Sequence, residues 1–187
     1  MRAVVGISAD VLQVIGTNCI YPAGDQSVLD RILTRYAVFR TADNEARILK
    51  LAPFAIVTHD DTILVRPKNN NFVLGFGRQC NWSPEYSLSS IKIAVIQTLY
   101  EELDQYIPET AYDLHPLGFL HTSDRNYDRS NLGCLFHIEL KGRQPSIIAN
   151  GNLWFVKMDN LDPYFFIGWS KYIVEHFLKL RQLAGLS

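Results

Sequence analysis

Short runs of apolar residues, bounded by polar or glycine-rich turns, occupy the middle of the chain and predict β-strands. The first two runs are residues 51–59 and 62–67, and the acidic pair Asp60 and Asp61 between them suits a tight hairpin turn. A third run, residues 71–77, ends in glycines. Later strands are predicted within residues 116–122, 131–140 and 152–158.

Two segments instead carry apolar residues at steps of three and four, which is the spacing of a helix with one buried face. One helix is predicted over residues 87–103, with Pro108 shortly after its end. Its apolar stripe contains Leu88, Ile91, Val95, Leu99 and Leu103. The other is predicted near the C-terminus, with a stripe of Phe165, Trp169, Ile173, Phe177 and Leu180. The order of strands, helix, strands and helix predicts a mixed sheet held between helices.

The first fifty residues form an accessory segment in this interpretation. Residues 1–16 are interpreted as a strand pair, with 11–15 as one strand, and residues 27–39 have helical spacing. Residues 41–45 make a polar connector. We therefore expect an N-terminal extension, 1–50, packed on a main domain, 51–187.

Composition limits the class of protein. The 187 residues suit a single domain, and the net charge of -1 gives no global attraction to nucleic acid or to an anionic membrane. No apolar stretch is long enough to cross a bilayer. The three cysteines are widely spaced and form no CxxC pair, so we expect reduced thiols and a cytoplasmic protein. Cys134 lies in a predicted buried strand, where packing is a simpler role than catalysis.

The helix over residues 87–103 carries paired acids, Glu101 and Glu102, after a glycine-ended strand and a loop. The segment 75–104 resembles the signature of the Nudix hydrolase superfamily, G-x5-E-x7-R-E-U-x-E-E-x-G-U, where U is bulky and apolar. In that family the glutamates share a helix face and hold divalent cations that bridge a diphosphate and activate water. Residues 51–77 and 116–140 also resemble strands of a bacterial Nudix branch of predicted phosphoesterases. The resemblance spans about residues 10–180 and implies an α/β fold, a Nudix-like α/β/α sandwich with a mixed β-sheet.

The signature is degenerate. With Glu101 and Glu102 aligned, Gln97 stands in place of the arginine and Thr98 in place of the first metal-binding glutamate. Asp104 replaces the later glycine. Strict spacing would put the early glycine and glutamate at Ser83 and Ser89, unless the loop holds an insertion that brings Gly77 and Arg78 to the glycine pair. The resemblance thus implies catalytic and metal-binding roles for Glu101 and Glu102 alone, with Mg²⁺ or Mn²⁺ weakly held. Glu85 or Asp104 would have to rebuild the site.

Further residues are candidates for substrate binding. Arg66, Lys68 and Arg78 lie near strand ends beside the cleft that the resemblance implies, where they would contact a diphosphate. Asp124 and Arg129 belong to a polar loop that either holds a phosphate or pairs with itself at the surface, and we expect this loop at the cleft rim near Glu101. The five histidines are scattered without ligand spacing and are interpreted as structural or surface residues.

Three functions remain open at this point. The first is a Nudix-like protein with a degraded catalytic box that binds a nucleotide or phosphorylated small molecule with little or no hydrolysis. The second is an active Mg²⁺- or Mn²⁺-dependent hydrolase of a nucleoside diphosphate-linked substrate. The third is a protein-interaction module without a ligand. No membrane or bulk nucleic-acid partner is expected, and a homodimer is compatible with the sequence.

Overall fold

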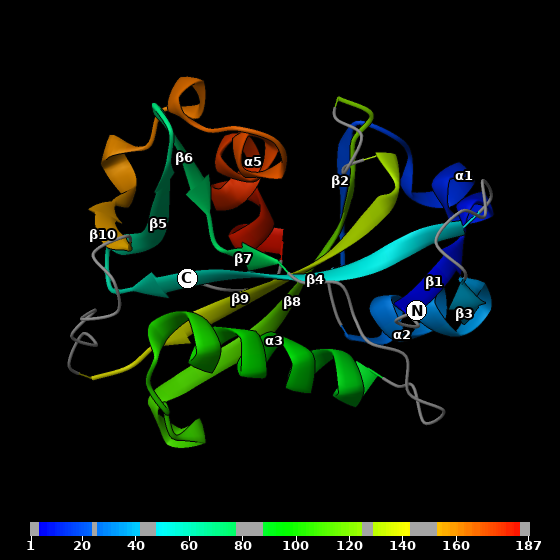
Figure 1. Ribbon diagram of the computed structural model, residues 1–187, viewed down its shortest axis with the longest axis horizontal. Helices are drawn as coiled ribbons and strands as arrows, with labels where there is room; N and C mark the ends of the chain where they lie inside the picture. The colour runs from blue at the N-terminus through cyan, green and yellow to red at the C-terminus, as the bar shows by residue number, and fades with distance from the viewer. Residues whose placement is uncertain are drawn as a thin grey trace.

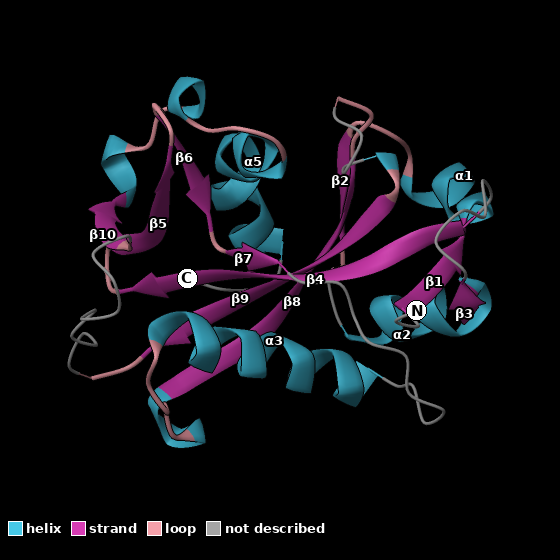
Figure 2. Cartoon of the chain, in the orientation of Figure 1, coloured by secondary structure: helices cyan, strands magenta, loops and turns pink. Residues whose placement is uncertain are grey.

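A computed structural model describes residues 4–23, 26–41, 48–77, 88–124, 129–142 and 153–183. Its centre is a mixed β-sheet with helices on both faces (Figure 1, Figure 2). The strand order is β10-β5-β4-β9-β8-β2, where the edge strand β10 spans Trp154–Lys157. Off this path, β1 pairs with β4 and with β3, β6 pairs with β5, and β7 pairs with β4. The predicted α/β sandwich with a mixed sheet is confirmed. Within the described ranges, no helix is both long and apolar enough to cross a membrane.

The middle of the sheet is formed by β4 (Ile48–His59) and β9 (Asn131–Leu140). They run parallel, in register from Lys50 opposite Asn131 to His59 opposite Leu140. β9 pairs antiparallel with β8 (Tyr112–His121). The apolar run 51–59 is buried throughout, because helices cover both faces of the central strands.

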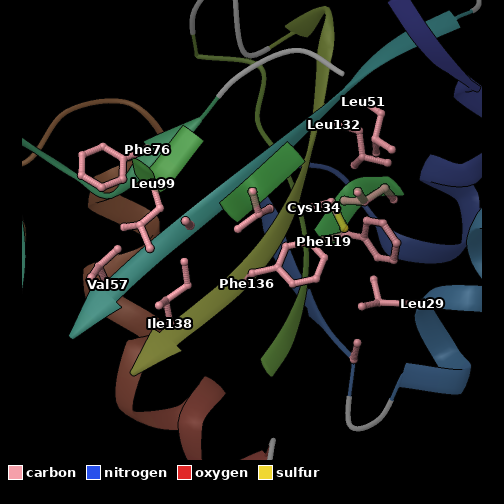
Figure 3. Close-up of a cluster of buried hydrophobic side chains, with 14 of the residues drawn as sticks. Leu29, Leu51, Val57, Phe76, Leu99, Phe119, Leu132, Cys134, Phe136 and Ile138 are labelled. Atoms are coloured by element: carbon pink, nitrogen blue, oxygen red, sulfur yellow. The ribbon is translucent and has the colours of Figure 1, made fainter. Parts of the chain in front are cut away.

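One face of the sheet is covered by α3 (Leu88–Leu103). Ile91, Val95, Leu99 and Leu103 are at most 3% exposed, which confirms the predicted stripe. Together with Phe119, Phe136 and other sheet residues they form one core cluster (Figure 3). Cys134 lies in the same cluster and is fully buried, so its predicted packing role is confirmed.

The opposite face is covered by α5 (Trp169–Leu183), which buries Trp169, Ile173 and Phe177 as predicted. Leu180, the last residue of the predicted stripe, lies outside the residues whose side chains are described. Phe165 does not belong to this stripe. It ends the 3-10 helix η4 (Pro163–Phe165) and is 47% exposed. The helix cannot begin there because the next residue, Phe166, is extended and makes a β-bridge to Phe72.

The N-terminal segment differs from its prediction first at residues 11–15. β1 (Val4–Ser8) is followed by the 3-10 helix η1 (Ala9–Val11) and by α1 (Leu12–Ile15), so a strand over 11–15 was wrong. The Ser8 side chain accepts a hydrogen bond from the backbone of Asp10, which starts this turn, and Val11 and Ile15 are buried four residues apart.

The rest of this segment is joined closely to the sheet. Its elements are β2 (Cys19–Pro22), α2 (Gln26–Tyr36) and β3 (Ala37–Thr41), so the expected helix ends earlier than residue 39. β1 pairs with β4, and β2 pairs with β8. Ile7, Leu29 and Leu33 belong to the α3 core cluster. Residues 1–50 therefore share a core with the rest, and the division at residue 50 stays a prediction. Of the expected connector 41–45, only Thr41 is described.

The predicted strand 71–77 is interrupted. It forms β6 (Asn71–Leu74), which pairs with β5 (Thr62–Lys68), and β7 (Phe76–Gly77), which pairs with β4. Gly75 lies between them with φ 66°, and a Cβ there would lie 2.0 Å from the Ala55 carbonyl oxygen, so only glycine fits. β5 pairs with β4 only near the hairpin turn, at Thr58 and His59. The β5–β6 ribbon therefore leaves β4, and β7 takes its place.

Candidate functional site

A pocket of about 260 Å³ opens where the β5–β6 ribbon leaves β4. Its walls come from β4, β5, β6, β7, the end of α3 and the start of α5. The described lining residues are Phe54, Arg66, Lys68, Val73, Gly75, Phe76, Gly77, Glu102 and Trp169. Residues from both faces of the sheet can meet here because the strands separate at this point.

Arg66 and Glu102 form the main polar contact of the pocket. The Arg66 guanidinium donates a hydrogen bond to the Glu102 carboxylate, and the two side chains are 37% and 33% exposed. The guanidinium also lies over the ring of Phe76, 5.6 Å from its centroid. A carboxylate on one side and an aromatic face on another hold Arg66 in a defined orientation.

Lys68 follows Arg66 by two residues on β5, and alternate residues of a strand point to the same face. The described lining thus contains two cationic side chains, Arg66 and Lys68, and one carboxylate, Glu102. The net charge of the described pocket lining is therefore +1. A pocket with this balance suits an anion better than a metal cation.

The described residues do not fit the Mg²⁺ or Mn²⁺ that the resemblance implies. Thr98 shares a helix face with Glu102, but its buried hydroxyl donates to the carbonyl oxygen of Ala94 at 2.8 Å. Glu101 is exposed and does not line the pocket, because neighbouring helix residues point about 100° apart. Within the described ranges, no three or more His, Cys, Asp or Glu residues gather as a metal site. Arg78 and Glu85 lie outside those ranges.

The polar loop after β8 is described only at its two ends. Asp124 accepts a hydrogen bond from the Tyr172 hydroxyl of α5 at 2.6 Å, and Arg129 donates to the Ser123 carbonyl oxygen. Neither Asp124 nor Arg129 lines the pocket. Residues 125–128 lie outside the described ranges. A ligand-binding role for Asp124 and Arg129 stays a prediction.

Sequence reasoning did not identify four residues of the pocket wall, namely Phe54, Val73, Phe76 and Trp169. Trp169 was recognised only as a member of a buried helix stripe, and Phe54 only as part of a buried strand. In the structure their rings lie edge to face, 6.0 Å apart. No local pattern marks them as wall residues, since their role depends on the separation of β5–β6 from β4.

Two buried histidines have structural contacts. His137 is fully buried and shares a hydrogen bond of 2.7 Å with the Thr58 hydroxyl. The ring of His59 lies 2.8 Å from the carbonyl oxygen of Gly142. These bonds join β4 to β9 and to the chain after it, so both residues serve the fold rather than the pocket.

No family model and no curated protein matches this chain. Solved structures do match it. Tm1382, provisionally assigned as a Nudix hydrolase, superposes with a TM-score of 0.77 at 18% identity, covering 96% of this chain and 100% of that one. The C-terminal domain of mouse MUTYH, in its complex with human PCNA, matches with a TM-score of 0.50 at 9% identity, over 71% and 89% of the two chains. NrtR from Shewanella oneidensis matches with a TM-score of 0.50 at 13% identity, over 71% and 62%.

The chain therefore has the fold of the Nudix hydrolases. At identities this low the likeness establishes the fold alone, because proteins that share a fold carry many different functions. The function has to be argued from the pocket.

Proposed function

We propose that this protein binds a phosphorylated small molecule or nucleotide in the pocket beside β5, with little or no metal-dependent hydrolysis. The observation that supports this function is the ion pair between Arg66 and Glu102. In a working metal site of this fold, the glutamates of the helix would be directed at a cation. Here Glu102 is bound by a guanidinium instead.

Electrostatics opposes a divalent cation at this position. Mg²⁺ in proteins is held by carboxylate and other oxygen ligands in near-octahedral geometry. Only one carboxylate, Glu102, lines the described pocket, and Arg66 and Lys68 would repel a cation placed beside it. Thr98, which shares a helix face with Glu102, supplies no negative charge for a cation.

The same features favour a phosphate group. A guanidinium has five N–H donors, so Arg66 retains donors beyond the one directed at Glu102, and Lys68 adds a second positive charge. Phe54, Phe76 and Trp169 supply an aromatic wall for the rest of the ligand. At about 260 Å³ the pocket is slightly smaller than typical ligand sites, which span roughly 300–1,000 Å³. It therefore suits a phosphoryl group with one adjoining ring, and the rest of a nucleotide would extend outside it.

Binding in the presence of EDTA tests this function. We expect AMP or phenyl phosphate to raise the melting temperature of the wild type, and calorimetry to give a saturable isotherm, without added metal. Arg66→Ala and Lys68→Ala should weaken binding about tenfold or more, because each removes a charge-assisted contact worth roughly 1.5–3 kcal/mol. Lys171→Ala, which removes an exposed lysine of α5, is the matched control.

Two results would contradict the proposal. Binding that needs Mn²⁺ and is lost in EDTA would indicate that carboxylates outside the described ranges complete a metal site. The absence of binding to any phosphorylated compound would favour a protein-interaction role.

A further inference from the structure

Glu102 is the one carboxylate among the described residues of the pocket lining, which include two cations and three aromatic rings. We infer that Glu102 sets the charge of the ligand, so that the pocket selects a singly charged phosphodiester over a doubly charged phosphomonoester. This inference rests on the proposed function and assigns its ligand class. It gives Glu102 a role in specificity in place of the metal ligation that the helix position would suggest.

Glu102 lies beside one of the two cations of the proposed phosphate site. Its carboxylate accepts a hydrogen bond from Arg66, so any phosphate bound by Arg66 lies close to Glu102 as well. Glu102 is about two-thirds buried and Arg66 only slightly less, which limits the screening of charges between them and the ligand.

The charges of the described pocket favour a singly charged ligand. With Arg66, Lys68 and Glu102 the pocket has a net charge of +1, which one negative charge on the ligand neutralises. A dianion leaves one negative charge uncompensated. It also loses more hydration energy on entry, because the cost of desolvating an ion rises with the square of its charge. Removal of the Glu102 charge would give a net charge of +2, which matches a dianion.

Neutralising Glu102 has a different consequence for this role than for two other roles of the same residue. If Glu102 were a metal ligand, its neutralisation would weaken binding. If it served only to tie α3 to β5, its neutralisation would lower stability and leave the preference between ligands unchanged. If Glu102 sets the charge of the ligand, its neutralisation should tighten the binding of a dianion. The preference of the pocket should then shift from the singly charged toward the doubly charged ligand.

Calorimetry with two matched probes tests the inference. Phenyl phosphate is a dianion at pH 8, since the second ionisation of a phosphomonoester has a pKa of about 6, and methyl phenyl phosphate keeps one charge. Both are titrated in EDTA into the wild type, Glu102→Gln and Glu175→Gln. Glutamine keeps an oxygen that accepts from Arg66 but has no charge. Glu175 is an exposed carboxylate of α5, so its variant controls for the change in overall charge.

We expect the wild type to bind methyl phenyl phosphate more tightly than phenyl phosphate. In Glu102→Gln the affinity ratio of dianion to monoanion should rise about five- to tenfold, the effect of one charge at contact distance in a partly exposed site. Glu175→Gln should change the ratio less than about twofold. Glu102→Asp, which restores the charge, should return the ratio toward that of the wild type.

A ratio that is the same in the wild type and Glu102→Gln, with binding intact, overturns the inference and leaves the proposed function standing. A wild type that already prefers the dianion also overturns it. Loss of binding in Glu102→Gln, with a melting temperature near that of the wild type, would indicate a direct ligand contact and overturns it too. If no variant binds either probe, both proposals fail.

Discussion

The guanidinium of Arg66 on β5 donates a hydrogen bond to the carboxylate of Glu102 on α3, across 36 residues of sequence. This contact joins the β5–β6 ribbon to α3, the helix that covers one face of the sheet. It also changes the chemistry of the helix, since a carboxylate paired with a cation is a poor ligand for a second cation.

Hydrolysis is the first property to test. We expect the wild type, assayed with nucleoside diphosphate-linked substrates in Mg²⁺ or Mn²⁺, to turn over no faster than the Glu101→Gln, Glu102→Gln double variant. A water nucleophile needs a firmly held cation, and only Glu102 lines the described pocket. The measurement is product release by chromatography. Metal-dependent turnover that disappears in the double variant would show that other acids, such as Glu85 or Asp104, complete the site.

The helix over the core cluster should be sensitive to loss of volume. Leu99→Ala should lower the free energy of unfolding by about 2–5 kcal/mol, because Leu99 is fully buried and its loss leaves a cavity. Ile93→Ala on the same helix is the control. Ile93 is 56% exposed, so its variant should stay within about 0.5 kcal/mol of the wild type. Urea unfolding measures both, and equal effects would contradict the orientation of α3.

Gly75 and Gly142 allow backbone strain to be separated from a steric clash. Both have positive φ, 66° and 73°. An added Cβ at Gly142 meets nothing within 4 Å, so Gly142→Ala should cost only the left-handed penalty of about 1–2 kcal/mol. Gly75→Ala should cost clearly more, since its Cβ would overlap the Ala55 carbonyl oxygen. Thermal unfolding measures the loss of stability in both variants. Equal losses would show that the β6–β7 break tolerates a side chain.

Alkaline pH should act through Tyr112. Burial, with a hydrogen bond to Tyr100, raises the pKa of the Tyr112 hydroxyl from 10.0 to about 12. A raised pKa means that the folded state favours the protonated form. The resulting stabilisation is complete below pH 10 and is lost as the pH rises toward 12. Stability should therefore fall more steeply over this range in the wild type than in Tyr112→Phe. Tyrosine ionisation is followed by the absorbance near 295 nm during an alkaline titration. If no tyrosine titrates later than the others, this prediction is contradicted.

Local pattern was enough to predict most of the secondary structure. The spacing of Ile91, Val95, Leu99 and Leu103 predicted both α3 and its buried face, because one side of a helix repeats at three and four residues. Asp60 and Asp61 marked the β4–β5 turn. The segment 11–15 was assigned wrongly because a short apolar run fits a strand or a single helical turn equally well. In the structure Ser8 caps the 3-10 turn η1, which leads directly into α1.

The sequence by itself also determined which side chains the helix carries. Gln97 and Thr98 precede the acids Glu101 and Glu102, and no folding changes the charge of these side chains. Tertiary structure alone decided which residues Glu102 contacts. Because the β5–β6 ribbon leaves β4 near Gly75, Arg66 of β5 contacts Glu102 of α3. Phe54 and Trp169 line the same pocket. These contacts join residues from distant parts of the chain, and no local periodicity encodes such distances.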